Sequence, residues 1–483
     1  MNVVEHFPLM IPGAPEAEGK PLAVISPYDE KTIASVATAN GAGVEHALNN
    51  AGNLFADRSH WLPVDQRIEI LERMVALLGE HAEELAIGAS LEGGKPLTDS
   101  RIEMARCIDS FRICIHTLRT DAVQPPVMGV NAASKHRIAS VRREPVGVVV
   151  AFSAFNHPLN LIAHQVGPAI AAGCPVIIKP AEKTPLSCIR LARLLYQAGL
   201  PDGWCQFVMP ETIDLAEALV TDSRVAFFSF IGSAKVGWLL RSKLAPGTRC
   251  ALEHGGVAPV VIAGDVDINQ LLPGLLKGAF YHAGQVCVSV QRIFVHASIA
   301  RELADKMADK ARELVVGDPL AEQTEVGPLV RPQESERVDQ WVKEAVAGGA
   351  ELLCGGETLA HHCYAPTVLF NPPCDARVST QEVFGPVACI YPFAEADAAI
   401  KAANALDVAF QASVYSRDID MALYISERLA ASAVMINDHT AFRVDWMPFA
   451  GLKHSGLGIG GIPFTMRDMQ IEKMTLIHSD AVM

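Results

Sequence analysis

Apolar residues recur at three- and four-residue spacing from residue 65 to about residue 119, as in "DQRIEILERMVALLGEHAEELAIGASLEGG". This spacing places apolar side chains on one face of a helix and predicts a helical region. The pattern then changes at residues 123–143. Prolines interrupt this segment, apolar and polar residues partly alternate in it, and it is rather basic. Such a segment is typical of an extended hairpin or arm and not of a core element.

Short apolar runs alternate with helical patterns between residues 146 and 262. The runs are "VGVVVAF", "PVIIKP", "WCQFVM" and "VAFFSFIG", with helices beginning near residues 159, 186 and 213. This alternation predicts a parallel sheet covered by helices on both faces. A second α/β region runs from "PVVIAGD" through "RIFVHAS" to "ACIYPF", and the tail after Pro463 begins helical and ends extended.

The size and charge of the chain narrow its class. A length of 483 residues predicts two or three structural units. The formal charge of −14 lacks any basic stripe, which disfavours nucleic acid as a partner. No apolar run reaches the roughly 18–20 residues that span a bilayer, and the N-terminus shows no signal-peptide pattern. We therefore expect a soluble, cytoplasmic protein without a membrane partner.

Eleven cysteines are scattered along the chain, with no CxxC pair and no Cys/His cluster at zinc spacing. This usage fits a reducing cytoplasm and predicts neither a disulfide framework nor a metal site.

Two loops that follow predicted strands suit a nucleotide. In "FFSFIGSAKVG", Gly232, Ser233 and Gly237 open a helix whose first backbone N–H groups suit a pyrophosphate, although an ordinary glycine turn fits as well. In "VIIKPAEKTP", Lys179 can donate to a ribose hydroxyl or a phosphate and Glu182 can accept from a ribose diol. The alternative is a solvated loop with two ordinary charges. Two such loops at the strand ends of one sheet favour a nucleotide site more than either loop does alone.

A third glycine-rich stretch, "GLGIGG" with Gly456, Gly458 and Gly461, satisfies the spacing GxGxxG. A dinucleotide site also needs a preceding strand and a βαβ unit of about 30 residues, and only 22 residues follow Gly461. We predict a turn here.

Three residues are candidates for covalent chemistry. Cys287 lies in "HAGQVCVSVQR" among small residues, where Gly284 permits close backbone approach; the alternative is a buried, inert thiol. Glu253 precedes two glycines after a strand, and Asn156 follows the "VGVVVAF" strand; their alternatives are a surface carboxylate and a helix cap. We expect His157 and His254 to pack or to form hydrogen bonds and to take no part in catalysis.

The ordered motifs "FNHP", "KPAEKTP", "FIGSAKVG", "LEHGG", "GQVC", "EVFGPV" and "PFAGLKHSG" resemble the NAD(P)-dependent aldehyde dehydrogenase superfamily over residues 20 to 480. The resemblance implies an α/β protein with a Rossmann-like nucleotide-binding domain, an α/β catalytic domain and a small β oligomerisation arm, assembled as a homodimer or homotetramer. The implied boundaries are 1–122 and 142–253 for NAD binding, 254–462 for catalysis, and 123–141 with 463–483 for the arm.

The same resemblance implies roles for individual residues. Cys287 would be the nucleophile, Asn156 and the Cys287 backbone N–H would hold the oxyanion, and Glu253 would activate the water that hydrolyses the thioester. Lys179 belongs to both the catalytic and the cofactor sets. The full cofactor set is Phe155, Lys179, Glu182, Gly232, Ser233, Gly237, Glu382 and Phe384.

Several positions depart from the family pattern. Ala154 and Phe155 stand where Pro-Trp is frequent, and His254 stands where leucine is usual. Ala450 and Ile459 replace a frequent glycine and arginine. These changes alter the wall of the aldehyde pocket but remove no catalytic group.

The resemblance also bears on the cofactor and the product. Glu182 would repel a 2′-phosphate, so NAD is favoured and NADP stays possible. Glu253 favours release of a free acid, because members that pass the acyl group to coenzyme A generally lack it. A coenzyme A-acylating semialdehyde dehydrogenase, an NAD-independent cysteine hydrolase using Cys287 with His282, and a non-catalytic relative are the alternatives.

The substrate is the least determined feature. "AFRVDWMPF" resembles the branch that includes lactaldehyde and non-phosphorylating glyceraldehyde-phosphate dehydrogenases, which act on small polar or anionic aldehydes. Arg443 could pair with an anionic tail, joined by Arg106 and Arg112 of a predicted helix. Val286 argues against a phosphate, since phosphate users often carry arginine there, and a structural role for Arg443 is the alternative.

Overall fold

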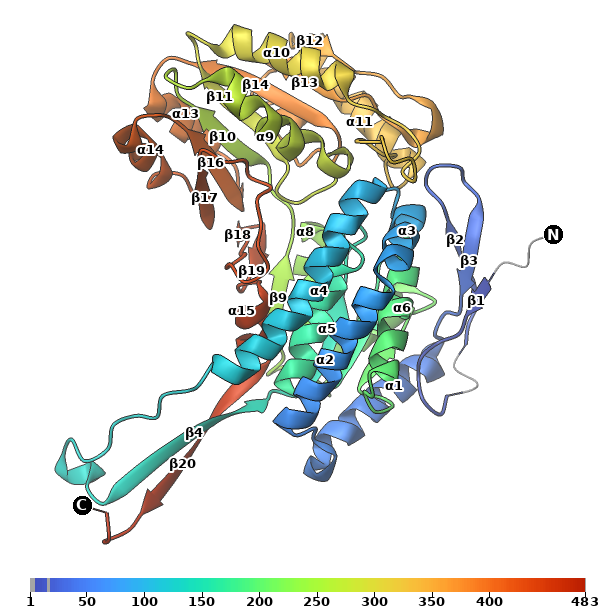
Figure 1. The fold of residues 1–483 in the computed structure, drawn as a ribbon, viewed down its shortest axis with the longest axis vertical. Helices are drawn as coiled ribbons and strands as arrows, with labels where there is room; N and C mark the ends of the chain where they lie inside the picture. The colour runs from blue at the N-terminus through green and yellow to red at the C-terminus, as the bar shows by residue number, and fades with distance from the viewer. Residues whose placement is uncertain (1–4, 15–17, 483) are drawn as a thin grey trace.

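The first sheet is built from the short apolar runs predicted as parallel strands, and it lies in the lower part of the molecule (Figure 1). The computed structural model describes residues 5–14 and 18–482. All five residues of β5 (Val148–Phe152) are buried, as expected for a strand covered on both faces. The order is β19 (Gly456–Leu457), β9 (Arg249–Glu253), β8 (Val225–Ile231), β5, β6 (Val176–Lys179) and β7 (Cys205–Phe207), with only the β19 pairing antiparallel.

Helices cover both faces of this sheet. Val149 and Ala151 of β5 pack toward one helical layer, and Val148, Val150 and Phe152 pack toward the other. The first layer contains α2 (Val64–Glu80), α4 (Leu97–Thr120), α5 (Asn160–Ala172) and α6 (Pro185–Gln197), and the second contains α1 (Gly41–Ala56), α7 (Ile213–Thr221) and α8 (Ala234–Arg241).

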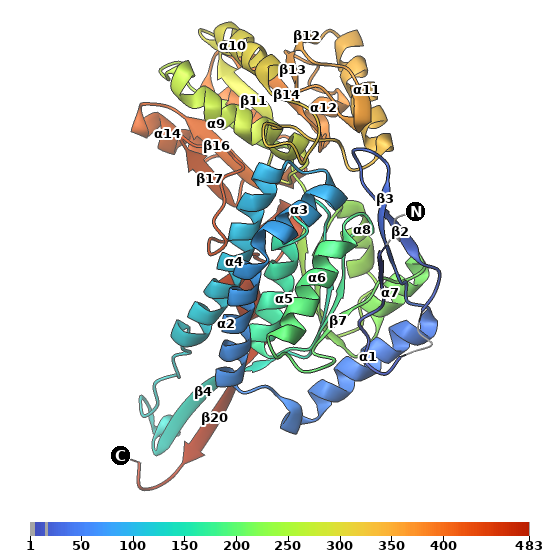
Figure 2. The ribbon, with the colours of Figure 1, turned by 45° about the vertical axis from the view of Figure 1, so that its right-hand side comes forward.

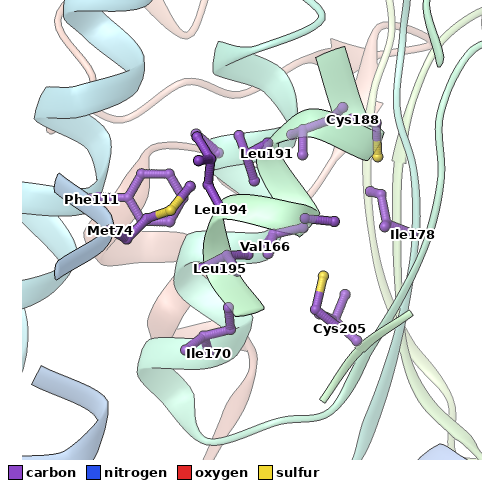
Figure 3. Packing of buried hydrophobic residues seen from close by; sticks show 14 of the residues in the cluster. Met74, Phe111, Val166, Ile170, Ile178, Cys188, Leu191, Leu194, Leu195 and Cys205 are labelled. Atoms are coloured by element: carbon purple, nitrogen blue, oxygen red, sulfur yellow. The ribbon is translucent and has the colours of Figure 1, made fainter. Parts of the chain in front are cut away.

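The helical region predicted for residues 65–119 is confirmed as three helices, α2, α3 (Ala82–Gly93) and α4. Figure 3 shows part of the core that they share with the sheet, where Met74 and Phe111 lie beside Leu194 of α6. The second α/β region lies above this layer in both views (Figures 1 and 2).

The second sheet has seven strands and is parallel except between its first two strands. Its order is β12 (Glu351–Cys354), β13 (Thr367–Phe370), β14 (Val387–Phe393), β11 (Val290–His296), β10 (Ala258–Ile262), β16 (Gln411–Tyr415) and β17 (Ala433–Ile436). The helices of this region are α9 (Ile268–Phe280), α10 (Ala300–Glu313), α11 (Pro332–Ala347), α12 (Arg377–Thr380), α13 (Ala396–Ala403) and α14 (Ile419–Ser426). The α/β fold expected from the sequence is confirmed.

A two-stranded arm extends from the body (Figure 1). β4 (Arg137–Pro145) pairs antiparallel with β20 (Gln470–His478), from Pro145 opposite Gln470 to Arg137 opposite His478. β20 follows α15 (Ile462–Asp468), which agrees with a tail that begins helical and ends extended. The role of the arm in assembly stays a prediction.

Some local structure was not expected. A sheet of β1 (Glu5–Phe7), β3 (Thr32–Val36) and β2 (Leu22–Ile25) precedes α1, and β15 (Val408–Ala409) pairs with β18 (Leu452–Lys453). β19 is the edge strand of the first sheet, and α15 packs against α5. The domain boundaries stay a prediction. Over the described ranges, no helix combines the length and the apolar character needed to cross a bilayer.

Candidate active site

A cavity of about 1010 Å³ opens at the carboxyl ends of β5, β6, β8 and β9, where a doubly wound sheet binds ligands. The loop between α9 and β11 closes it from the other sheet. It brings together most of the predicted site residues: Arg106, Phe155, Asn156, Lys179, Glu182, Gly232, Ser233, Glu253, Cys287, Glu382, Phe384 and Arg443. Gly237 and Arg112 do not line it, and Arg112 is exposed on α4.

A left-handed turn presents Cys287 to the cavity. His282, Ala283 and Gly284 have φ of 48°, 54° and 68°, a conformation that L-residues rarely adopt. A Cβ on Gly284 would lie 2.2 Å from the Gly385 carbonyl oxygen, so this position requires glycine. Gln285 fixes the turn, because its Nε2 donates to the carbonyl oxygens of His282 and Pro328, both at 3.3 Å.

The Cys287 thiol is neutral in this state of the protein. Burial raises its pKa to about 12, while the positive charge of Arg443 acts in the opposite direction. The carboxylates of Glu382 and Glu253 add to the increase. A nucleophilic role therefore requires further positive charge or hydrogen-bond donors beside the sulfur during the reaction.

Asn156 is held from two sides. Its side-chain Nδ2 donates to the backbone carbonyl oxygen of Gln285 at 3.0 Å, and its backbone carbonyl oxygen accepts from Lys95 Nζ at 3.2 Å. Lys95 is fully buried and forms an ion pair with Glu103. The N-terminus of α5 is capped by Glu103, which accepts from the backbone N–H groups of Leu159 and Asn160, so Asn156 does not cap that helix. The second Nδ2 hydrogen of Asn156 is left for a ligand.

Glu253 ends β9 at the cavity. Burial raises the pKa of its carboxyl, and the charge of Arg443 opposes this increase. A Cβ on Gly460 would lie 2.1 Å from Glu253 Oε1, so the "GLGIGG" stretch packs against this carboxylate. Gly456 belongs to β19, and Gly458 and Gly461 have φ of 83° and 99°, which fits a turn and not a dinucleotide motif.

The proposed nucleotide loops lie where the sequence places them. Ser233 precedes α8, and Lys179 ends β6 with its Nζ 3.8 Å from Glu182 Oε1. Burial lowers the pKa of Lys179, against the effect of Glu182. Gly237 lies under His254, because a Cβ there would come within 2.1 Å of the imidazole Cε1.

Glu382 supplies one buried carboxyl oxygen that is open to a ligand, while a backbone hydrogen bond from Gly256 acts on the same carboxyl. Its Oε1 has no hydrogen-bond partner among the described residues, and burial raises its pKa to about 8. A Cβ on Gly255 would lie 1.8 Å from that oxygen, so Gly255 permits the close approach. Phe384, with φ of 46°, packs edge to face with Phe155 at 5.8 Å between ring centroids. A carboxyl group with one free buried oxygen, beside aromatic rings, fits a ribose and its base ring.

The predicted non-catalytic histidines have partners. His254 Nδ1 lies 2.9 Å from the Gly232 carbonyl oxygen, and its ring packs against Phe230 and Trp238. His157 Nε2 lies 2.9 Å from the Tyr281 hydroxyl. All eleven cysteines lie among the described residues and are free thiols, and these residues hold no cluster of His, Cys, Asp and Glu that could bind a metal.

Arg443 and Arg106 both line the cavity, and Arg106 pairs with Asp445, whereas Arg443 Nε lies 3.7 Å from that carboxylate. Arg106 donates twice to Asp445, from Nη2 at 2.7 Å and from Nε at 3.1 Å. Arg443 stacks over Phe449 at 3.4 Å and reaches His164 Nδ1 with Nη2 at 3.3 Å. The guanidinium Nε of Arg443 has no hydrogen-bond partner among the described residues.

Residues 14–475 match the aldehyde dehydrogenase family. The chain belongs to this family. It is similar to 3-sulfolactaldehyde dehydrogenase of Priestia aryabhattai, with 35% identity over 99% of each chain. Among solved structures it is similar to aldehyde dehydrogenase 21 of Physcomitrella patens in complex with the reaction product succinate, with a TM-score of 0.94, 31% identity and full coverage of both chains. Glyceraldehyde-3-phosphate dehydrogenase GapN of Methanocaldococcus jannaschii, complexed with NADP, has a TM-score of 0.90 and 34% identity over 96% of this chain and all of that chain.

These likenesses confirm the family resemblance and the fold, and the protein is an NAD(P)-dependent aldehyde dehydrogenase. A cysteine hydrolase is not favoured. Sequence reasoning missed the residues behind the site, Lys95, Glu103, Gln285 and Asp445. Their only visible signal was a charged or amide residue inside an apolar pattern, which does not reveal its partner.

Proposed function

We propose that this aldehyde dehydrogenase oxidises a short aldehyde with an anionic tail to the free carboxylic acid. The observation that carries the proposal is that Arg443 and Arg106 line the same cavity as Cys287. The relatives named for sulfolactaldehyde and for a succinate product act on, or yield, small anionic molecules. Guanidinium groups pair with carboxylate and sulfonate oxygens through two parallel hydrogen bonds.

The first half of the reaction uses Cys287 and Asn156. The Cys287 thiol first gives its proton to a water molecule in the cavity. The thiolate then attacks the aldehyde carbon, and the carbonyl oxygen becomes an oxyanion that accepts hydrogen bonds from Asn156 Nδ2 and the Cys287 backbone N–H. Because Asn156 is anchored through Gln285 and Lys95, its amide is oriented before the substrate arrives. A bound NAD would supply the hydride acceptor, and loss of hydride from the tetrahedral carbon leaves a thioester on Cys287.

The second half uses Glu253. Its carboxylate, with a pKa raised by burial, takes a proton from the water that attacks the thioester carbon. The Cys287 sulfur leaves and the acid is released. Hydrolysis at this residue supports a free acid as the product over transfer to coenzyme A.

The roles proposed for the cofactor residues rest on the polar groups that line the cavity and have a free donor or acceptor. Glu382 would accept from the nicotinamide ribose and Phe384 would pack beside it. Lys179 and Glu182 would hold the adenosine ribose, with the start of α8 at the pyrophosphate. Glu182 disfavours a 2′-phosphate, which supports NAD as the preferred cofactor and leaves NADP possible.

The arm supports assembly into a homodimer or homotetramer. Ile138 and Ile477 are directly paired across β4 and β20, and each is about half exposed, at 50% and 53%. Exposed apolar residues on an isolated strand pair suit a surface of a second subunit.

The test is NADH formation with a panel of short aldehydes, neutral and anionic. We expect the anionic aldehydes to have the higher kcat/KM, and Arg443→Ala to raise KM for them at least tenfold more than for propanal. An equal effect of Arg443→Ala on both kinds of aldehyde would assign Arg443 a structural role and overturn the anionic substrate.

A further inference from the structure

The two arginines of the substrate pocket share one buried carboxylate. Asp445 is 2% exposed and accepts from Arg106 through two bonds, from His164 Nε2 at 2.8 Å and from Asn160 Nδ2 at 3.2 Å. Burial alone would raise the pKa of this carboxyl, but its bonds with His164 and Arg106 hold the pKa well below the usual range. Asp445 is therefore ionised, and it does not itself line the cavity.

The hydrogen-bond directions fix the charge of His164. An ionised carboxylate only accepts, so the proton of His164 is on Nε2. Its Nδ1 then accepts from Arg443 Nη2, which is possible only for a neutral ring. Burial lowers the pKa of His164, in agreement with the neutral form.

The cluster of Arg106, Arg443, Asp445 and neutral His164 therefore carries a single net positive charge. Arg106 is neutralised pairwise by Asp445, whereas Arg443 lies 3.7 Å from it by its Nε, beyond hydrogen-bonding distance. Arg443 is 9% exposed and its Nε has no partner among the described residues. A buried guanidinium with a free donor lacks the partner that such groups require, and a substrate anion supplies it.

We propose that Asp445 sets the charge of this pocket so that it accepts a singly charged tail, a carboxylate or sulfonate, and rejects a doubly charged phosphate. This inference rests on the proposed function. A monoanion would leave the cluster neutral, whereas a dianion would bury an uncompensated negative charge. In their ionised forms, Glu253 and Glu382 in the same cavity add to the cost of that second charge. Asp445 is a positioning and charge-setting residue that does not touch the substrate.

The test compares four aldehydes of similar length with the whole enzyme and NAD. Butanal is neutral, succinic semialdehyde and a sulfonated three-carbon aldehyde are monoanions, and glyceraldehyde 3-phosphate is a dianion above its second pKa of about 6. At a pH about two units above this phosphate pKa, we expect kcat/KM for each monoanion to exceed kcat/KM for the phosphate at least tenfold. If butanal equals the monoanions, the proposed function fails; if only the phosphate equals them, this inference alone fails.

Two substitutions then move the pocket charge in opposite directions. Asp445→Asn removes one negative charge with little change of shape, so the net charge of the pocket rises by one. We expect the phosphate-to-carboxylate ratio of kcat/KM to rise at least tenfold. Arg106→Gln removes one positive charge and should lower the same ratio. A ratio unchanged in both variants, with all four aldehydes slowed equally, would show that Asp445 only supports the structure and would overturn the proposal.

Discussion

Gly460 lies directly against the carboxylate of Glu253, where a Cβ would stand 2.1 Å from Oε1. The same Cβ would lie 2.9 Å from the Phe449 carbonyl oxygen, so the neighbouring backbone offers little room. Gly460→Ala must therefore displace the Glu253 side chain. Since Glu253 serves the hydrolytic half of the proposed reaction, the position of this glycine links the "GLGIGG" stretch to catalysis.

We predict that Gly460→Ala slows steady NADH formation at least tenfold and leaves the first turnover nearly intact. Rapid-mixing measurement of the NADH burst separates the two phases. Gly317→Ala is the matched control, because nothing lies within 4 Å of its added Cβ. A burst that falls as much as the steady rate would mean that Gly460 shapes the nucleophile and not the base.

Glu253→Gln tests the base directly. A general base contributes about 10²–10⁴ to the rate of its step. We expect one NADH per site at nearly the wild-type rate, followed by turnover slowed by about that factor. In the wild-type enzyme, the steady rate should rise with pH through a pKa above the ordinary glutamate value, because burial keeps Glu253 protonated at lower pH. Equal loss of burst and steady rate would remove Glu253 from the hydrolytic step.

The sequence predicted those parts of the fold that local pattern controls. The strands β5, β6 and β8 are largely continuous apolar runs, and the two nucleotide loops directly follow β6 and β8, so these strands could be predicted from the sequence. β1 and β2 are short and largely exposed, with no periodicity to detect. Pairings between distant segments, such as Lys95 with Asn156, depend on the tertiary fold and have no local signal.

One error had a signal in the sequence. Arg106 and Arg112 are six residues apart on α4, which separates them by about 120° around the helix axis and by about 9 Å along it. Their side chains therefore leave the helix in different directions, and only Arg106 lines the cavity. The bond from Arg106 to Asp445 distinguishes Arg106 from Arg112. It has no local signal, because Asp445 is 339 residues away in the chain.

Glu103→Gln should destabilise the protein through its buried partner. The substitution leaves Lys95 charged, buried and without its carboxylate, and breaking a buried pair in this way costs about 3–5 kcal/mol. Glu72→Gln is the control, because its pair with Arg119 is about half exposed and such pairs contribute about 0–1 kcal/mol. Urea unfolding of both variants gives the comparison. Equal midpoints would show that the Lys95 ion pair contributes little.

Ile477→Asp should dissociate the assembly. A carboxylate on the apolar arm would be buried against a second subunit, and Ile138 opposite offers no partner for it. Light scattering after gel filtration is expected to show smaller particles for this variant. Val346→Asp, at an exposed apolar position at the end of α11 far from the arm, should not change the mass. An unchanged mass for Ile477→Asp would exclude the arm from assembly.

Binding of NAD should release a proton from Glu382. Burial raises its pKa to about 8, so its carboxyl is mostly protonated at neutral pH. Ribose hydroxyls that donate to the carboxylate favour its charged form and lower the pKa, so up to about one proton leaves on binding. The release should fade above about pH 8, where the free enzyme has already lost this proton. Calorimetry in buffers of different ionisation enthalpy counts the protons. Glu382→Gln should bind NAD without this release, and a release that persists in the variant would assign the proton to another group, such as Lys179.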